Sequence, residues 1–281
     1  MPLKLGITGN RGFIAKHLFE HLDSLNHKVF DLDPALKGNR VELPKKINSI
    51  FHLAARSDIQ EAFNHPGDIL DNNLKCLLDA LQLSKSHGAR FIFFSSYTYG
   101  QPQTSPISEE HPQASLNPYM GSKLLGEALA KEFCRWSDME LVILRPFSIY
   151  GNNMRPGRLV SDLIYQAKSG GPLNLRSPDP IRDYLHVKDL CRLCEKIIHT
   201  PLKKNQDPSF NVGSGFQCSN LELAQHVKDM AGISEEILID QIDRRGDVFE
   251  VIPALEKVKS TFDWEPTISL KEGLIGMLKA P

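Results

Sequence analysis

Short apolar segments of strand length alternate with longer segments of helical periodicity over the first half of the chain. The segments predicted to be strands are Leu3–Thr8, Lys28–Leu32, Ser49–Ala54, Arg90–Ser95 and Leu141–Pro146. The segments with apolar residues at helical spacing are Gly12 to Leu25, Asp68–His87 and Pro118–Trp136. Because strand–helix alternation is typical of a parallel sheet covered by helices on both faces, this order predicts an α/β fold with a doubly wound parallel sheet.

The second half of the chain has a different pattern. After Gly151 prolines and glycines become frequent and strand-like segments become sparse, with Ser209–Val212 as one further candidate. This change predicts a second, smaller C-terminal lobe. The predicted division places residues 1–150 and about 184–213 in the sheet domain, and residues 151–183 and 214–281 in the lobe.

The connection between the second and third predicted strands is short. Only about 15 residues separate Asp33 from Ser49, whereas a parallel crossover usually needs a dozen or more residues. Arg40–Leu43 is a candidate short strand, and the residues after it leave no room for a helix. We therefore expect an abbreviated connection.

Composition excludes several classes of protein. Of the 281 residues 41% are hydrophobic and 24% are charged, which is ordinary for a globular protein. The formal net charge is −1 and no basic runs are present, which argues against a nucleic-acid partner. The apolar stretches are far shorter than the roughly 20 residues of a membrane span, and no signal segment is visible, so we expect no membrane association.

The five cysteines are an odd count, and we interpret them as reduced thiols of a cytoplasmic protein. Cys191 and Cys194 form a Cys-x-x-Cys pair, but no second pair or nearby group of histidines completes a metal site. Their spacing is also that of a helix face packed into a core. We therefore predict core cysteines and no bound metal.

A glycine-rich turn follows the first predicted strand. Gly6, Gly9 and Gly12 recur every three residues just before a predicted helix. Such a turn lets the backbone and the helix N-terminus approach a pyrophosphate, so it predicts a dinucleotide site. Asp33 follows the second strand about 20 residues later, where an acceptor for a ribose hydroxyl belongs, with Asp31 as a rival. Because neither position is arginine, NAD is favoured over NADP.

Tyr119 and Lys123 are four residues apart at the start of a predicted helix, which places them on one face. A neighbouring ammonium and an oxidised nicotinamide would both lower the pKa of a phenol, which predicts a general acid/base. Tyr184 and Lys188 share the spacing in a segment that looks extended, where four residues span about 13 Å. We therefore favour Tyr119 and expect Tyr184 to be a surface or packing residue.

Ser95 and Ser96 end the fourth predicted strand. Ligands of open parallel sheets bind beyond the carboxyl ends of the strands, so a hydroxyl there can bond to a substrate oxygen. Capping of the following turn is the alternative interpretation.

Further motifs occur along nearly the whole chain. They are His52-Leu53-Ala54-Ala55, Asn73, Ser95-Ser96-Tyr97-Thr98-Tyr99-Gly100, Leu144-Arg145-Pro146-Phe147-Ser148-Ile149-Tyr150-Gly151, Arg182-Asp183-Tyr184-Leu185-His186-Val187, Phe210-Asn211-Val212-Gly213, Arg245-Gly246-Asp247 and Trp264-Glu265-Pro266. With the glycine turn and the Tyr–Lys pair, and in this order, the chain resembles the extended short-chain dehydrogenases/reductases of the NAD-dependent epimerase/dehydratase (nucleotide-sugar) family.

The resemblance implies a Rossmann-type NAD-binding domain, a substrate-binding C-terminal lobe and roles for matched residues. The implied catalytic residues are Tyr119, Lys123 and, counted back four residues from Tyr99, Ser95. The implied cofactor-binding residues are Gly6, Gly9, Asn10, Arg11, Gly12, Phe13, Ile14, Asp31, Asp33, Leu53, Ala54, Ala55, Asn73, Ser95, Tyr119, Lys123, Pro146 and Phe147. The implied substrate-binding residues are Ser95, Ser96, Tyr97, Ser148, Arg182 and Arg244.

The resemblance further implies an enzyme acting on a hydroxyl of a nucleotide sugar, with 4-epimerisation as the leading expectation. Ser96-Tyr97 stands where 4,6-dehydratases carry Asp-Glu, which argues against dehydration. An NAD(P)H-dependent reductase of nucleotide 4-keto sugars and a non-catalytic dinucleotide sensor or scaffold remain as alternatives. A homodimer through the helices near 68–87 and 118–136 is also implied.

Overall fold

The computed structural model describes residues 1–39, 41–203, 206–240 and 248–280. The chain divides into two compact units. Unit 1 comprises Met1–Gln101, Glu109–Pro146 and Cys191–Asn211. Unit 2 comprises Pro102–Ser108, Phe147–Leu190 and Val212–Pro281. Among the described residues, no helix combines the length and apolar composition needed to span a bilayer.

Unit 1 is built on a six-stranded sheet in the order β2-β1-β3-β4-β5-β9. The strands are β1 (Lys4–Thr8), β2 (Lys28–Asp31), β3 (Ser49–His52), β4 (Arg90–Phe94), β5 (Leu141–Pro146) and β9 (Ser209–Val212). Each neighbouring pair from β2 to β5 is parallel. β3 and β5 are buried along their whole length, as expected for strands covered on both faces. The five strands predicted in the first half and the further candidate Ser209–Val212 are confirmed, with small shifts at some ends.

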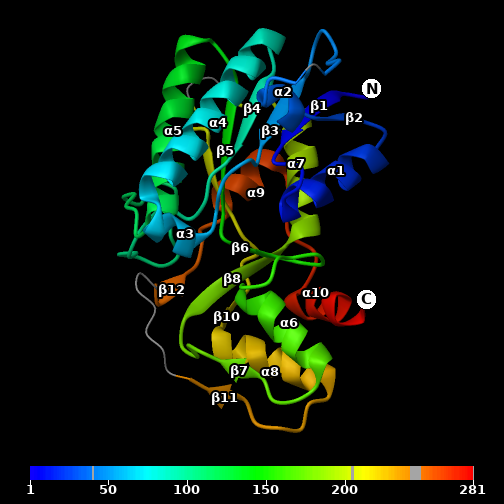
Figure 1. Cartoon of the computed structure of the whole chain (residues 1–281), viewed down its shortest axis with the longest axis vertical. Helices are drawn as coiled ribbons and strands as arrows, with labels where there is room; N and C mark the ends of the chain where they lie inside the picture. The colour runs from blue at the N-terminus through cyan, green and yellow to red at the C-terminus, as the bar shows by residue number, and fades with distance from the viewer. Residues whose placement is uncertain (40, 204–205, 241–247, 281) are drawn as a thin grey trace. The chain divides into compact units, whose positions relative to one another are not determined.

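Helices cover both faces of this sheet, which is therefore a doubly wound, Rossmann-type sheet. The helices of unit 1 are α1 (Phe13–Ser24), α2 (Asp33–Leu36), α3 (Ile59–Asn64), α4 (Pro66–His87), α5 (Pro118–Trp136) and the later part of α7 (Val187–His199). Figure 1 shows α4 and α5 on one side of the sheet and α1 and α7 on the other. Cys191 and Cys194 are buried on α7, which confirms the prediction of core cysteines. No metal-binding cluster of His, Cys, Asp or Glu occurs among the described residues.

Helices α4 and α5 pack closely against each other and against the sheet. Leu77 of α4 and Ala130 of α5 share a core with Phe93 of β4. A Cβ atom on Gly126 of α5 would lie 3.0 Å from Phe93 Cζ and 3.1 Å from Leu77 Cδ2. Because glycine has no Cβ, α5 can lie at this short distance from both neighbours. This packing fixes the position of the residues on the inner face of α5.

The connection from β2 to β3 is abbreviated, as predicted. Among its described residues the one regular element is the four-residue α2, which begins at Asp33. The predicted short strand at Arg40–Leu43 is wrong for residues 41–43, which pair with no strand, whereas Arg40 lies outside the described residues. Before them, Lys37, Gly38 and Asn39 donate their N–H groups back to the carbonyl oxygens of Asp33, Ala35 and Pro34, so this part of the connection is folded on itself and is not extended.

Unit 2 has more strands than expected, but they are short. Strands β10 (Gln217–Ser219), β8 (Ile181–His186) and β12 (Glu250–Val251) form one sheet, β6 (Ser148–Tyr150) pairs with β8, and β7 (Asn174–Leu175) pairs with β11 (Leu238–Ile239). Its helices are α6 (Leu159–Ser169), α8 (Asn220–Ala231), α9 (Glu256–Phe262) and α10 (Leu270–Lys279). α6, α8 and α10 contribute Leu163, Leu223 and Leu274 to a common core.

A buried carboxylate organises the last part of unit 2. Asp189 is fully buried at the start of α7. It accepts hydrogen bonds from the N–H of Thr267 (3.2 Å) and the N–H of Ile268 (3.0 Å). Its carbonyl oxygen accepts the indole N–H of Trp264 at 3.1 Å. Asp189 therefore ties the segment between α9 and α10 to the start of α7.

Candidate functional site

The glycine turn after β1 is held against the loop after β3. Gly9 has a φ of +74°, and a Cβ atom there would lie 2.7 Å from the backbone nitrogen of Ala54. Only glycine fits this position, both for its backbone conformation and for the lack of space. Gly12 donates its N–H to the Gly9 carbonyl at 2.8 Å and directly precedes α1. The turn thus presents backbone and a helix N-terminus, as a pyrophosphate cradle requires.

Asp33 lies beside this turn. Its Oδ1 accepts the N–H of Gly9 at 2.7 Å, and its Oδ2 accepts the N–H of Asn10 at 3.1 Å. Asp31 instead accepts the backbone N–H of Asp33 at 2.9 Å. Of the two acids, Asp33 is therefore the one beside the glycine turn, and Asp31 supports its backbone. This arrangement favours Asp33 as the ribose acceptor.

The end of β3 carries a buried histidine next to the same turn. His52 Nδ1 lies 2.9 Å from Thr8 Oγ1, which also accepts the N–H of Ala54 at 3.2 Å. The ring stacks against both Phe91 and Phe93, with centroids 5.9 Å from each. Burial, with a smaller contribution from the charge of Lys123, lowers the pKa of His52 to about 3. The imidazole is therefore neutral and links β1 to the loop that contains Ala54 and Ala55.

Asn73 of α4 holds the chain that follows this loop. Its Oδ1 accepts the N–H of Arg56 at 2.8 Å, and its Nδ2 donates to the Arg56 carbonyl at 3.1 Å. The same Nδ2 donates to Ser122 Oγ of α5 at 2.9 Å. Asn73 is thus a link between the loop after β3 and α5.

Tyr119, Lys123 and Glu127 follow one another at intervals of four residues on α5. Lys123 is buried, and its Nζ donates to the carbonyl oxygen of Phe94 at 2.7 Å. Burial lowers the pKa of Lys123 to about 8, against the opposing effects of Cys76 and Glu127. The side chain therefore carries its positive charge at pH 7. Tyr119 is half-buried one turn earlier, near the N-terminus of the helix.

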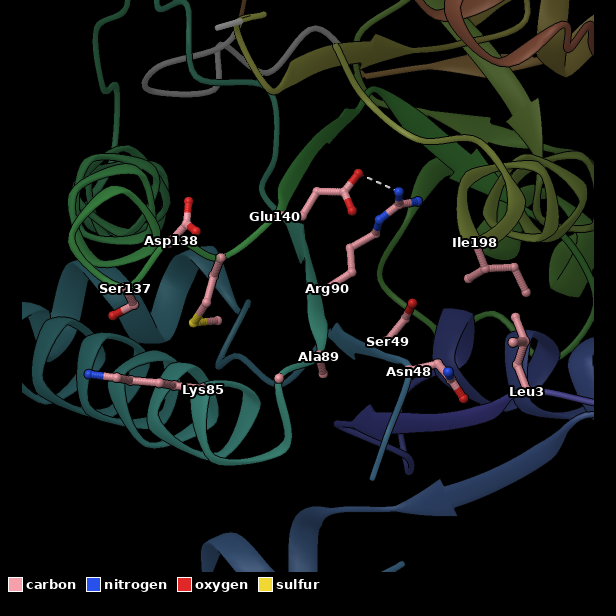
Figure 2. Close-up of a pocket in the computed structure, with 12 residues that line it drawn as sticks. Leu3, Asn48, Ser49, Lys85, Ala89, Arg90, Ser137, Asp138, Glu140 and Ile198 are labelled. Carbon is pink, nitrogen blue, oxygen red and sulfur yellow. Dashed lines mark hydrogen bonds and ion pairs between the residues drawn. The ribbon is translucent and has the colours of Figure 1, made fainter. Parts of the chain in front are cut away.

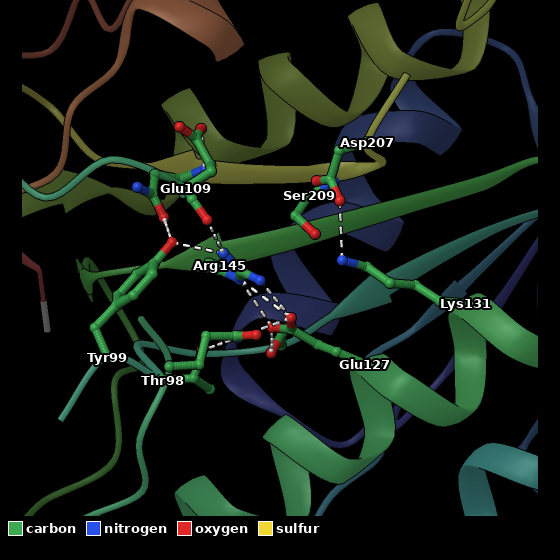
Figure 3. A network of polar contacts seen from close by, with 11 residues as sticks. Thr98, Tyr99, Glu109, Glu127, Lys131, Arg145, Asp207 and Ser209 are labelled. Atoms are coloured by element: carbon green, nitrogen blue, oxygen red, sulfur yellow. Dashed lines mark hydrogen bonds and ion pairs between the residues drawn. The ribbon is translucent and has the colours of Figure 1, made fainter. Parts of the chain in front are cut away.

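A buried ion pair lies one turn beyond Lys123 (Figure 3). Arg145 of β5 donates through Nη2 to Glu127 Oε2 at 2.6 Å and through Nε to Oε1 at 3.0 Å. Both side chains are at most 3% exposed. Glu127 Oε1 also accepts the hydroxyl of Ser95 at 2.5 Å, and Oε2 accepts Gln113 Nε2 at 3.0 Å. Removing one member of such a pair typically costs about 3–5 kcal/mol, because the other charge stays buried.

Tyr99 extends this network. Its hydroxyl accepts Arg145 Nη1 at 2.7 Å and donates to Asn211 Oδ1 at 2.6 Å (Figure 3). Burial raises the pKa of Tyr99 to about 12, so the phenol keeps its proton. Tyr97 packs against the Tyr99 ring and donates its hydroxyl to the Gly100 carbonyl. The loop after β4 is therefore held by side chains from α5, β5 and β9.

Sequence reasoning did not identify Glu127 or Arg145 as site residues. Two signals were present. Glu127 continues the four-residue spacing of Tyr119 and Lys123, and Arg145 is a charge within an otherwise apolar strand. A charge in such a strand requires a buried partner of opposite sign.

Of the other predicted residues, Gly6 lies in β1, Arg11 in the glycine turn, Phe13 and Ile14 at the start of α1, Leu53 just after β3 and Ser96 just after β4, whereas the rest lie at β5 and in unit 2. Pro146 ends β5, Phe147 donates its N–H to the Val212 carbonyl at 3.0 Å, and Ser148 starts β6. Arg182 of β8 donates to the carbonyl oxygens of Ile181 (2.9 Å) and Phe249 (3.3 Å). Arg244 and the Arg245-Gly246-Asp247 motif lie outside the described residues.

Tyr184 is a packing residue, as predicted. It is 6% exposed, its ring stands edge-on to Tyr150 at 6.4 Å, and its hydroxyl lies 3.4 Å from Asn220 Oδ1. Burial raises its pKa far above the ordinary range. Its phenol therefore stays protonated and is unsuited to act as a base.

Two cavities lie away from the residues above. One, of about 460 Å³, lies at the amino ends of the strands of unit 1 and includes Arg90 and Glu140 (Figure 2). Arg90 is bound there by Glu140 and by the carbonyl oxygens of Ile197 and Thr200. The other, of about 640 Å³, lies in unit 2 between α6 and β7.

Comparison with known proteins gives consistent matches over the whole chain. The model of the NAD dependent epimerase/dehydratase family matches residues 5–213. A putative UDP-glucose 4-epimerase of Methanocaldococcus jannaschii is 27% identical, with 95% of each chain covered. A UDP-glucose 4-epimerase of Lacticaseibacillus casei is 27% identical, with 94% of this chain and 92% of that protein covered.

Solved structures with the same fold cover nearly all of the chain. The UDP-glucose 4-epimerase of Thermotoga maritima, solved with UDP-glucose, has a TM-score of 0.87 at 24% identity, covering 99% of this chain and 98% of that chain. RMD of Pseudomonas aeruginosa, complexed with NADPH, has a TM-score of 0.87 at 26% identity, covering 98% and 97%. The region matched by the family model contains the glycine turn, Asp33 and the inner face of α5.

Proposed function

The chain belongs to the NAD dependent epimerase/dehydratase family, and from this we propose that it is an NAD-dependent 4-epimerase of a nucleotide sugar. One observation carries the proposal. Helix α5 places Tyr119 one turn before Lys123, whose buried ammonium is fixed by the Phe94 carbonyl at the carboxyl end of β4. The glycine turn follows the carboxyl end of β1 in the same parallel sheet, so the base and the cradle share one edge.

The residues of this edge fit a bound NAD. The turn around Gly9 leaves no room for a side chain but offers backbone to a pyrophosphate, and Asp33 provides a carboxylate for a ribose. When bound, NAD supplies an acceptor and then a donor for a hydride. Tyr119 as phenolate takes the proton of the sugar hydroxyl and later returns it. Lys123 favours that phenolate through its positive charge.

We propose that unit 1 holds the cofactor and unit 2 the nucleotide sugar. The relatives named as UDP-glucose 4-epimerases support a UDP-hexose as substrate. Ser148, Arg182 and Arg244 are the proposed contacts of this lobe. A guanidinium suits the oxygens of a diphosphate.

A reductase of nucleotide 4-keto sugars is the second candidate, because RMD was solved with NADPH. Asp33 disfavours it, since its carboxylate beside the glycine turn would repel a 2′-phosphate. A non-catalytic sensor is disfavoured because the chain keeps both Tyr119 and Lys123. Net oxidation of added NADH by a UDP-4-keto sugar, without epimerisation, would support the reductase.

Replacement of Tyr119 tests the proposal. The wild-type protein with NAD is expected to convert UDP-glucose to its 4-epimer, followed by NMR of the anomeric proton. Tyr119→Phe should lose about 10²–10⁴-fold in kcat, because it removes the acid/base group, while NAD binding persists. Tyr184→Phe is the matched control, since Tyr184 has the same spacing to Lys188, and it should retain turnover. Wild-type activity in Tyr119→Phe would contradict the proposal.

We also propose a homodimer formed through α4 and α5, and a cytoplasmic location. Leu125 of α5 is 47% exposed, which supports an apolar contact on the outer face of these helices. The five free cysteines, four of them buried, support a reducing compartment.

A further inference from the structure

Asn73 of α4 uses every hydrogen bond that its amide can make. Its Oδ1 accepts the N–H of Arg56 at 2.8 Å and an N–H of the Asn72 amide at 3.1 Å. Its Nδ2 donates to the Arg56 carbonyl at 3.1 Å and to Ser122 Oγ at 2.9 Å. A primary amide has two hydrogens to donate and two lone pairs that accept. All four are occupied, so Asn73 has no hydrogen bond left for a bound cofactor.

The two bonds to Arg56 fix the loop after β3 at the residue that follows Ala55. A backbone N–H can only donate and a carbonyl can only accept, so these bonds admit only one orientation of the Asn73 amide. At the start of the same loop, Thr8 Oγ1 accepts the N–H of Ala54 at 3.2 Å. The two alanines that we expect to contact NAD are therefore held on both sides.

Ser122 of α5 extends the connection to Tyr119. Its hydroxyl donates to the carbonyl oxygen of Tyr119 at 2.7 Å. Because this hydrogen is directed to the carbonyl, Ser122 Oγ is the acceptor for Asn73 Nδ2. Asn73 is 6% exposed and Ser122 is 2% exposed, so little water can compete for the bond between them. A continuous series of hydrogen bonds thus runs from the loop after β3 through Asn73 and Ser122 to the turn of α5 that carries Tyr119.

Tyr119 lies in the part of α5 that the helix itself stabilises least. It is the second residue of the helix, and the first four N–H groups of a helix have no partner within it. In the proposed reaction Tyr119 must lie within hydrogen-bond reach of the sugar hydroxyl that is oxidised. A misplacement of about 1 Å at such a group can cost about 100-fold in rate. The bonds that connect this turn to the loop after β3 therefore bear on the rate of the reaction.

Building on the proposed function, we propose that Asn73 and Ser122 are positioning residues that hold the Tyr119 turn and the loop after β3 in one fixed arrangement. Neither residue touches the reacting atoms. Asn73 supports the loop that contacts NAD, whereas the sequence analysis expected Asn73 itself to contact the cofactor. The four occupied bonds of its amide are the observation that redirects this expectation.

Variants of the two residues should separate the rate from cofactor binding. Ser122→Ala removes the link but leaves both bonds of Asn73 to Arg56, so kcat with saturating NAD and UDP-glucose should fall by about 10–100-fold. KM and the Kd for NAD should stay unchanged. Asn73→Ala also releases the loop, so it should in addition raise the Kd for NAD by about tenfold or more. Titration of the intrinsic fluorescence with NAD measures Kd, and circular dichroism checks that each variant is folded at the assay temperature.

Two further variants distinguish positioning from a general loss of stability. Ser122→Thr keeps the hydroxyl, and threonine can bond to a carbonyl one turn earlier in a helix, so it should recover most of the rate. Ser86→Ala is the matched control, because Ser86 Oγ donates to the Leu83 carbonyl at 2.8 Å with the same three-residue spacing in α4. It should keep the wild-type kcat and the wild-type Kd for NAD.

Amide hydrogen exchange without any ligand tests the link independently of activity. Asn73→Ala should speed the exchange of the Arg56 N–H, which loses its acceptor, and of the first turn of α5. Ser122→Ala should speed exchange in that turn alone. If Ser122→Ala does not fold, the exchange and the Kd for NAD of Asn73→Ala still decide whether the link exists.

The outcomes separate this inference from the proposed function. Wild-type kcat in Ser122→Ala, or an equal loss in Ser86→Ala, would overturn the role of Ser122 while the epimerase proposal stands. An unchanged Kd for NAD in Asn73→Ala would overturn the role of Asn73. A wild-type protein that turns over no nucleotide sugar would reject the proposed function. In that case faster exchange at Arg56 and weaker NAD binding in Asn73→Ala would still support the link, and unchanged values would reject it.

Discussion

At the scale of single residues, His52 shows how burial sets a protonation state. Its buried ring stacks against two phenylalanines and bonds to Thr8, and burial lowers its pKa to about 3. In the unfolded chain the pKa returns to its ordinary value near 6.5. Between these two values the unfolded state binds a proton that the folded state does not. His52 therefore makes the folded state less stable as the pH falls from 6.5 towards 3.

His52→Asn tests this dependence, because the Asn amide can keep the bond to Thr8 but does not titrate. From pH 7 to pH 4, the His52 contribution should reduce the wild-type free energy of unfolding by about 3 kcal/mol, and the variant should lack this part of the loss. Asp183, whose pKa burial raises to about 6, acts in the opposite direction in both proteins. Urea unfolding at the two pH values measures the difference. His65→Asn, at an exposed histidine, is the control.

Lys123 predicts a second pH effect, on catalysis. Its pKa near 8 means that the charge that supports the Tyr119 phenolate is lost as the pH rises above 8. We expect kcat/KM for a UDP-hexose, at saturating NAD, to fall on that alkaline side. Lys123→Arg should be slower overall but should lack this decline, because a guanidinium stays charged. An unchanged alkaline decline in Lys123→Arg would show that another group causes it.

At the scale of elements, α10 contains two glycines with opposite surroundings. A Cβ atom on Gly273 would lie 2.2 Å from the hydroxyl oxygen of Tyr150, whereas nothing lies within 4 Å of a Cβ on Gly276. Tyr150 is fully buried in the same core, so it has little freedom to move away. The two positions therefore separate steric fit from helix propensity within one helix.

Alanine at these two positions should shift stability in opposite directions. Gly273→Ala should destabilise the protein by about 1–3 kcal/mol through overpacking. Gly276→Ala should stabilise it by about 0.5–1 kcal/mol, because alanine favours the helix. Chemical denaturation of both variants measures this. A neutral Gly273→Ala would mean that Tyr150 can move away from the new methyl group.

The elements also show which parts of the fold the sequence reveals. β5 and α5 have the predicted bounds because a continuous apolar run and a 3.6-residue period are local signals. β7 and β11 have two residues each, and more than sixty residues of sequence separate the two strands. No local sequence pattern therefore predicts them. α2 was missed for the same reason, since four residues contain barely one helical turn.

The candidate site shows a similar limit. Tyr119, Lys123 and the glycine turn can be predicted from the sequence, because the residues of each motif lie at a regular spacing within one short segment. The direction of the Ser95 hydroxyl depends instead on Glu127 and Arg145, which come from two other elements. Which of two adjacent serines bonds to the buried carboxylate therefore cannot be predicted from spacing along one element.

At the scale of the whole molecule, the balance of charge bears on assembly. The formal net charge of −1 means that two copies approach each other with little electrostatic repulsion. The proposed homodimer should therefore form at micromolar concentration, with light scattering giving twice the mass of one chain. Leu125→Glu should yield monomers, since it places a carboxylate in the proposed contact. Leu25→Glu, at an exposed leucine outside α4 and α5, should remain dimeric. A monomeric wild-type protein would reject the interface.

The bonds of Asp189 have a consequence for how the chain is synthesised. Its partners Trp264, Thr267 and Ile268 follow it by 75 to 79 residues. At about 5–20 residues per second, a ribosome adds them about 4 to 16 seconds later. Until then the carboxylate has only water in place of these bonds, and the nascent α7 lacks its final neighbours. This part of the molecule must therefore mature late in translation, which gives a chaperone several seconds to bind the exposed helix.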